Sequence, residues 1–122
     1  MDAKLVATGL AGSRLLIGSG FAAVPGVAAR SWIGPHAQDA GAKLMARATG
    51  ARDVGIALGT LATLGHKRQR GRWLEAAAIA DGIDLLATLA AARSLPRRSL
   101  AFGVFMTTAS TLVDLWLIRE LG

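Results

Sequence analysis

Charged side chains interrupt the apolar stretches of this 122-residue chain at well-separated positions. Arg14 lies in the first stretch, and the adjacent Arg52 and Asp53 lie in the second. The third stretch holds Asp81 and Asp84, which are three residues apart and therefore on one face of a helix. A guanidinium can bridge two carboxylates at once, whereas an unpaired charge inside a bilayer costs about 2.5 to 3.5 kcal/mol. We therefore expect these five residues to form one inward-facing intramembrane network.

The depths of the five charges agree with such a network. With a helical rise of about 1.5 Å per residue, all five lie about 12 to 18 Å from the side that carries both chain ends. Asp114 lies near the end of the fourth apolar stretch and comes out shallower, so it is predicted to be a peripheral member. Two arginines against three aspartates leave one negative charge over, which a proton, a bound cation or Arg47 could balance.

Three roles are open for a network of this kind. It can be a set of structural salt bridges that fixes which helix packs on which. One of its aspartates can titrate while a proton or cation crosses the membrane, because intramembrane ionisable residues mark such pathways. It can also form a site for a small molecule or a lipid headgroup. Asp53, Asp81 and Asp84 could hold a divalent cation, but Arg14 and Arg52 would oppose it, so no metal site is predicted.

Signatures of catalysis are missing from the sequence. It contains no nucleophile elbow, phosphate-binding loop, dinucleotide fingerprint or metalloprotease helix. Cysteine is absent, and His36 and His66 fall in predicted loops far apart in the chain, which is poor material for zinc. We therefore expect neither enzyme activity nor a cofactor.

The composition favours lipid as the environment. Apolar residues make up 52% of the chain and charged residues 18%, whereas soluble domains carry about a quarter charged residues. A soluble domain of this size could not bury so much apolar surface. The net charge of +6 gathers in segments between apolar runs, where cations meet anionic headgroups. Because tyrosine is absent and phenylalanine scarce, nucleic acid is not predicted as a partner.

The apolar runs predict an all-α fold, a four-helix transmembrane bundle with antiparallel up-and-down neighbours in a single domain over residues 1–122. No stretch alternates as a strand would. Starting the second helix near Lys43 makes it long enough to cross about 30 Å of hydrocarbon, although this buries Arg52 and Asp53. Pro96 separates the last two helices. The predicted helices cover about residues 5–27, 43–64, 73–92 and 98–117.

Several positions carry expectations about helix packing. Gly55 and Gly59 form a GxxxG pair, which lets a neighbouring helix approach closely. Trp32 is expected to anchor the chain at a membrane interface. Helical spacing also predicts two polar faces, formed by Asp81, Asp84 and Thr88 on the third helix and by Gly103, Thr107, Ser110 and Asp114 on the fourth.

Two alternatives to a multi-pass membrane protein stay open at this point. The first apolar run could be a signal peptide, with Lys4 ahead of it and a small-residue cleavage site at residues 26–28. Arg14 argues against this, because it would interrupt the hydrophobic part of the signal. The other alternative is a soluble all-helical bundle.

The predicted location is the cell membrane, with several crossings and the lipid bilayer as a partner. An even number of helices puts both chain ends on one side, and the counts of positive residues on the two sides are equal. The dense basic segment His66–Arg72 favours cytoplasmic ends. The predicted function is a non-catalytic structural or accessory subunit of a homo-oligomer or larger membrane complex. The alternative is an oligomeric proton- or cation-coupled transporter that uses the intramembrane aspartates.

Three short motifs carry a resemblance to a protein family. They are Arg14-Leu-Leu-Ile-Gly18 followed by Pro25, Ala46-Arg47-Ala-Thr-Gly50-Ala-Arg52-Asp53-Val-Gly-Ile-Ala-Leu-Gly59, and Asp81-Gly-Ile-Asp84-Leu-Leu. With these motifs the chain resembles a family of small four-helix integral membrane proteins common in actinobacteria, catalogued as a domain of unknown function. The resemblance covers most of the chain. It implies a membrane bundle and carries over no catalytic or ligand-binding residue.

Overall fold

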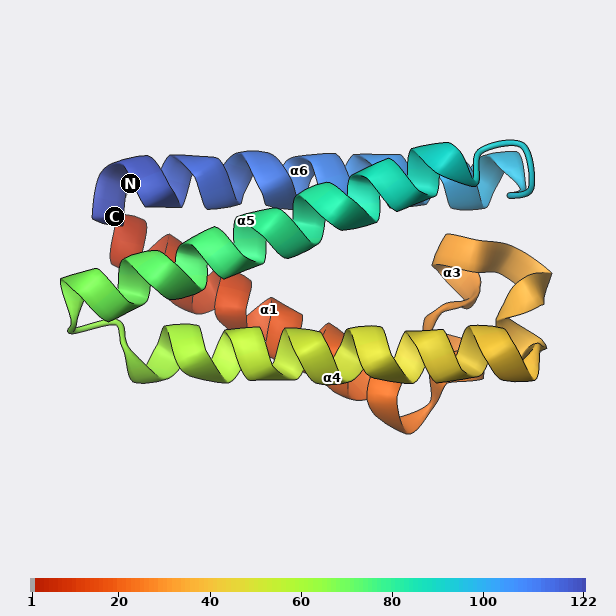
Figure 1. Ribbon diagram of the computed structural model, residues 1–122, viewed down its shortest axis with the longest axis horizontal. Helices are drawn as coiled ribbons and strands as arrows, with labels where there is room; N and C mark the ends of the chain where they lie inside the picture. The colour runs from red at the N-terminus through yellow and green to blue at the C-terminus, as the bar shows by residue number, and fades with distance from the viewer. Residues whose placement is uncertain (1) are drawn as a thin grey trace.

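The protein, seen in a computed structural model that describes residues 2–122, is helical throughout this part of the chain, with short connections and no strand (Figure 1). This confirms the all-α prediction. Three short segments connect the first long helix to the second: α2 (Pro25–Ala28), α3 (Arg30–Ile33) and the 3₁₀ helix η1 (Gly34–Gln38). The four long helices are α1 (Ala3–Ala23), α4 (Ala40–Ala62), α5 (Lys67–Ala90) and α6 (Arg97–Leu121).

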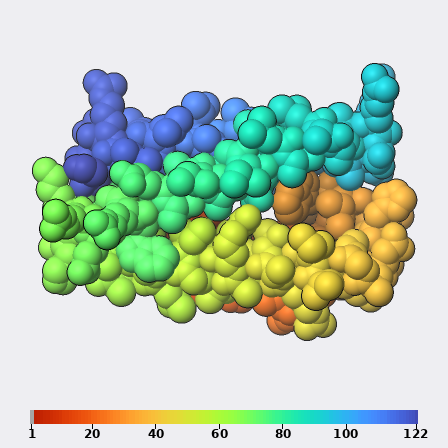
Figure 2. Space-filling view, in the orientation of Figure 1, coloured from red at the N-terminus to blue at the C-terminus, as the bar shows by residue number. Residues whose placement is uncertain are grey.

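The long helices pack as two antiparallel pairs, α1 with α4 and α5 with α6, while α1 and α6 make few contacts (Figure 1). Both chain ends and the turn between α4 and α5 lie at one end of the molecule, which we call the terminal end. The short helix α3 and the turn between α5 and α6 lie at the other end, the α3 end. Figure 2 shows α4 and α5 side by side across one face, diverging toward the α3 end.

The helix boundaries differ from the predicted ones by three residues or more in four places. α1 ends at Ala23 rather than near residue 27, because Pro25 has no backbone N–H with which to continue it. α4 begins at Ala40, three residues early. α5 begins at Lys67 rather than residue 73, since lysine, arginine and glutamine all favour helix and extend it through the predicted basic loop. α6 runs on to Leu121 instead of ending at residue 117.

Arg70, in the unpredicted first turn of α5, is buried and joins two helix ends. Its Nη1 donates to the carbonyl of Leu64, just beyond the end of α4. Its Nη2 donates at 2.7 Å to the carbonyl of Leu121, in the last turn of α6. The last carbonyls of a helix lack partners within the helix, so a guanidinium is well suited to them. The terminal end of the molecule is therefore held together by a residue that was predicted to lie in a basic segment between two helices.

Close approach of α1 and α4 depends on glycines other than the predicted GxxxG pair. A Cβ atom on Gly18 would lie 2.8 Å from the carbonyl oxygen of Gly50, and one on Gly50 would collide with the backbone of α1. Within the predicted pair, Gly59 packs against the ring of Trp73 on α5, whereas Gly55 has no neighbour within 4 Å. The prediction that Gly55 and Gly59 together allow a neighbouring helix to approach closely was therefore wrong.

Several charged side chains are buried, and many large apolar side chains are exposed. Arg14, Asp81 and Asp114 are buried, while Leu74 and Leu117 are the large apolar side chains that are fully buried among the described residues. In this part of the chain, α1 and α6 are the two helices long and apolar enough to span a membrane, and only 22% and 17% of their apolar stretches are buried. Large apolar side chains are exposed on all four long helices, among them Leu5, Leu16, Leu44, Leu58, Ile83, Leu86, Phe105 and Leu112.

Candidate functional site

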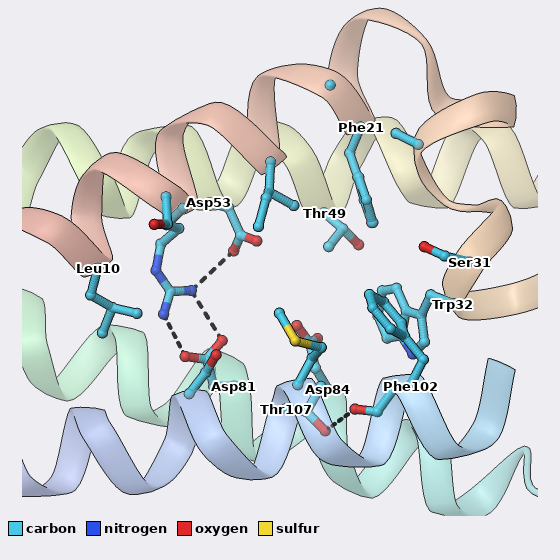
Figure 3. A pocket seen from close by; sticks show the side chains of 18 residues that line it. Leu10, Phe21, Ser31, Trp32, Thr49, Asp53, Asp81, Asp84, Phe102 and Thr107 are labelled. Carbon is cyan, nitrogen blue, oxygen red and sulfur yellow. Dashed lines mark hydrogen bonds and ion pairs between the residues drawn. The ribbon is translucent and has the colours of Figure 1, made fainter. Parts of the chain in front are cut away.

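Arg14 on α1 is the centre of a buried charge cluster. Its Nη1 donates to Asp81 Oδ1 on α5 at 3.0 Å, and its Nη2 donates to Oδ2 of the same carboxylate. Nη1 also lies 3.5 Å from Asp53 Oδ1 on α4 (Figure 3). Because Arg14 is only 8% exposed, these bonds tie α1 to α4 and α5 in the interior of the molecule.

Arg52 on α4 forms the second half of the network. Its Nη1 and Nη2 donate to the two carboxylate oxygens of Asp84 on α5, at 3.1 and 2.7 Å. Its Nε and Nη2 donate to Asp53 Oδ1 at 3.2 and 3.0 Å. Asp53 therefore accepts hydrogen bonds from both arginines and joins the two halves. The structure brings together all five residues predicted for the network, with Arg14 paired to Asp81 and Arg52 paired to Asp84. That the network lies inside a membrane stays a prediction.

Asp114 on α6 belongs to the centre of this cluster, so its peripheral placement was wrong. The residue is 0% exposed, and its Oδ2 lies 3.6 Å from Arg14 Nη2. One reason is the extra length of α6, which puts Asp114 about 10 Å from the helix end. The other is that side chains tilt toward the N-terminus of their helix. Because α1 and α6 run in opposite directions, Arg14 and Asp114 lean toward each other.

The cluster contains more negative than positive groups. Both carboxylate oxygens of Asp114 are buried without a hydrogen-bond donor among the described residues. Arg47, named above as a possible counter-charge, instead donates to the carbonyl of Ala22 at 3.2 Å in an exposed position. The cluster thus holds one more carboxyl group than the sequence indicated. Four aspartates lie with two arginines: Asp53, Asp81, Asp84 and Asp114 with Arg14 and Arg52.

A cavity of about 510 Å³ adjoins the cluster (Figure 3). It lies mainly between α1 and α6, the long helices with few mutual contacts, and side chains of α3, α4 and α5 close it. Ile17 and Phe102 line it and are 46% and 43% exposed, so the cavity opens sideways between these two helices. Its polar lining comes from the network and from hydroxyl groups: Arg14, Asp53, Asp81, Asp84, Ser13, Ser31, Thr49, Thr107 and Ser110.

Trp32 on α3 forms part of the cavity wall, a contact that the sequence did not predict, while its role as an interface anchor stays a prediction. Its Nε1 donates to the hydroxyl of Thr88 at 2.9 Å, and that hydroxyl donates to the carbonyl of Asp84 at 2.7 Å. The rings of Trp32 and Phe21 lie 6.1 Å apart. Gly103 on α6 makes room for the indole, because a Cβ there would be 2.6 Å from Trp32 Cδ1. Trp32 is therefore fixed between α5 and α6.

The two predicted polar faces meet in this region. Gly103, Thr107 and Ser110 line the cavity, while Thr88 holds the tryptophan. Sequence reasoning missed the aromatic wall, which consists of Phe21, Trp32 and Phe102. These residues come from α1, α3 and α6, and no periodic pattern connects residues on different helices. The one local feature that indicated space for an aromatic ring was the glycine at position 103.

Several polar side chains of the cavity are engaged in contacts within the protein. The hydroxyl of Thr107 donates within its own helix to the carbonyl of Gly103 at 2.6 Å, and Asp81 and Asp84 are occupied by guanidiniums. No group of three or more His, Asp or Glu side chains among the described residues is placed to hold a metal ion.

Comparisons with protein families, curated proteins and solved structures found no match to this chain.

Proposed function

We propose that this protein is a non-catalytic, multi-pass protein of the cell membrane whose Arg/Asp network holds its helices together. In this proposal all four long helices cross the bilayer, and the protein acts as a structural or accessory subunit in a homo-oligomer or larger membrane complex. One observation carries it. Charged side chains are paired in the space between the helices, while large apolar side chains lie on the outer surface of the bundle. Soluble proteins rarely expose extended apolar surface of this kind.

The charges of α4 and α5 are compatible with a membrane crossing. α4 has 23 residues and α5 has 24, which gives each a length of about 35 Å, more than the roughly 30 Å of hydrocarbon. Their mid-length charges face one another or Arg14 rather than the outside. All other charged residues of α5 fall in residues 67–75 at the terminal end, where they would lie among lipid headgroups.

The network supports a structural role because it joins helices that otherwise make few contacts. Through Arg14, α1 is linked to α5 and α6, and through Arg52, α4 is linked to α5. Removing one partner of a buried pair typically costs about 3 to 5 kcal/mol, because the other partner keeps an uncompensated charge. Pairings with this energetic weight select one arrangement of the helices over others.

Membrane fractionation tests the location. Cells producing the full chain would be lysed, and the membranes washed with alkaline carbonate, with a peripheral and an integral marker protein followed in parallel. The protein is expected to stay in the washed pellet with the integral marker and to need detergent for release. Recovery in the soluble fraction without detergent would overturn the proposal in favour of a soluble helical bundle.

A proton- or cation-coupled transporter, formed as an oligomer, is the second candidate. The surplus of carboxylates beside a laterally open cavity favours it, because transport pathways carry ionisable residues of this kind. Proton and cation flux into vesicles would be compared for wild type, Asp84→Asn and the loop control Asp39→Asn. The structural proposal expects no flux above protein-free vesicles. A flux that Asp84→Asn removes and Asp39→Asn leaves intact would establish the transporter instead.

A further inference from the structure

We propose that the cavity between α1 and α6 binds an amphipathic organic monocation, a quaternary or protonated amine attached to an apolar body. The proposal deepens the function above and rests on it for the ligand's environment, since the cavity opens on the side that would face lipid. The site itself follows from three features of the structure: its charge, its aromatic wall and its size.

The charge of the cavity favours a cation. Every hydrogen bond to Asp53 among the described residues uses Oδ1, and Figure 3 shows the second oxygen on the cavity side. Among the residues that line the cavity, the three carboxylates of Asp53, Asp81 and Asp84 stand against the single guanidinium of Arg14, so a bound monocation would reduce this negative surplus. An anion would meet that surplus, and both guanidiniums already have carboxylate partners. Charge complementarity therefore selects a positive ligand.

The aromatic wall selects a cation with an organic body. Phe21, Trp32 and Phe102 line the cavity, and the face of a tryptophan is the strongest aromatic partner for a cation. The hydrogen bond from Trp32 to Thr88 holds the indole in place before any ligand arrives. Such preorganisation lowers the entropic cost of binding.

The size of the cavity argues against a bare metal ion. At about 510 Å³ it falls within the range of roughly 300 to 1,000 Å³ that small-molecule sites occupy. A divalent ion would need several converging oxygens, yet the carboxylates of Asp81 and Asp84 are held by guanidiniums. An organic cation needs no such convergence, because its apolar body can fill the space between Leu10, Ile17 and Met106.

Three probes of nearly the same shape separate charge from shape. Purified full-length protein in detergent micelles would be titrated by calorimetry with benzyltrimethylammonium, with its neutral isostere neopentylbenzene and with the anion benzylsulfonate. The cation is expected to bind at least about tenfold more tightly than either of the others, a preference within reach of a desolvated cation–π contact with added charge attraction. Equal binding of the neutral isostere, or tighter binding of the anion, would overturn the proposal.

Substitutions then locate the site. Trp32→Leu and Asp53→Asn are each expected to weaken binding of benzyltrimethylammonium about tenfold. Asp39→Asn, an exposed loop carboxylate, and Trp73→Leu, a tryptophan outside the cavity, are the matched controls and should bind as wild type does. Circular dichroism and size-exclusion chromatography would show which variants keep the fold.

Two milder variants cover the case in which Asp53→Asn does not fold. Ser110→Phe fills the cavity without changing its charge and should abolish binding of the cation. Phe102→Leu, at a partly exposed position, should weaken it about threefold. Wild-type affinity in both of these variants would overturn the proposal. Binding is measured in micelles and is therefore independent of the membrane fractionation. If the protein stays in the carbonate-washed membranes but does not bind the cation, only the proposed binding site is disproved. If the carbonate wash releases the protein, only the membrane location is disproved.

Discussion

Asp53 is the residue that turns two ion-pair groups into one network. Its Oδ1 accepts from Arg52 at 3.0 Å and lies 3.5 Å from Arg14. Each arginine is held on its other side by an aspartate of α5. The position of each charge therefore depends on charges in two other helices, so we expect single substitutions to differ in cost according to how deeply the stranded partner is buried.

Asp81→Ala should lower the free energy of unfolding by about 3 to 5 kcal/mol, because it leaves the guanidinium of Arg14 buried without its main partner. Asp84→Ala should cost less, since the side chain of Arg52 is 33% exposed and keeps its bond to Asp53. Asp39→Ala, in an exposed position, should change little. Denaturant unfolding in micelles measures the order, and equal costs for Asp81→Ala and Asp39→Ala would contradict a structural network.

Asp114→Asn should cost less than about 1 kcal/mol, although Asp114 is the most deeply buried of the aspartates. Its carboxyl group receives no hydrogen bond among the described residues and lies in a cluster with more carboxyl groups than guanidiniums. The neutral amide removes that charge and can donate to a neighbouring carboxylate. The same unfolding measurement checks this against Asp81→Asn, which breaks the bidentate pair with Arg14. A larger loss for Asp114→Asn than for Asp81→Asn would mean that the ion pair at 3.6 Å outweighs the surplus.

At the scale of elements, glycine sets how closely α1 and α4 pack. Gly18 and Gly50 face each other so closely that an added Cβ on either would meet the backbone of the other helix. This contact lies in the same region of the pair as Asp53, because a Cβ on Gly18 would also lie 3.1 Å from the Asp53 Cβ. Helix spacing and network geometry are therefore coupled.

Gly50→Ala is expected to destabilise the protein by about 1 to 3 kcal/mol, because its methyl group must push α1 away. Gly55→Ala, on the same helix with no neighbour within 4 Å, is the matched control and should be neutral or stabilising by up to about 1 kcal/mol. Thermal unfolding in micelles followed by circular dichroism compares the two. A Gly50→Ala protein as stable as Gly55→Ala would show that the helices do not meet at this glycine.

At the scale of the whole molecule, both ends carry positively charged residues, and the surface between the ends exposes large apolar side chains. Lys67 and Arg68 begin α5 at the terminal end, while Arg97 and Arg98 begin α6 at the α3 end. Positive residues at both ends explain why counting them gave no orientation. Both chain ends lie at the terminal end, as expected for an even number of long helices (Figure 1).

Single cysteines can establish the topology, because the chain has no cysteine of its own. In intact cells, a membrane-impermeant maleimide should label Ser94→Cys, in the turn at the α3 end, and should not label Gly65→Cys, in the turn at the terminal end. Permeabilised cells should show labelling of both variants. Labelling of both in intact cells would contradict four membrane crossings, and the reverse pattern would put the chain ends outside.

The sequence by itself determined which charged residues belong to one network and which of them share a helix face. Arg14, Arg52, Asp81 and Asp84 could be assigned because charge, depth and face repeat locally along each helix, at about 1.5 Å and 100° per residue. Membership of the uncharacterised membrane family that these motifs resemble stays a prediction.

Only the tertiary structure decided how the helices meet. It brought Asp114 to Arg14, replaced the predicted glycine pair by Gly18 and Gly50, and turned Trp32 into a cavity wall. These outcomes depend on the rotation and stagger of one helix against another. Contacts between residues far apart in the chain fix both quantities, and the periodicity of a single helix contains no information about them.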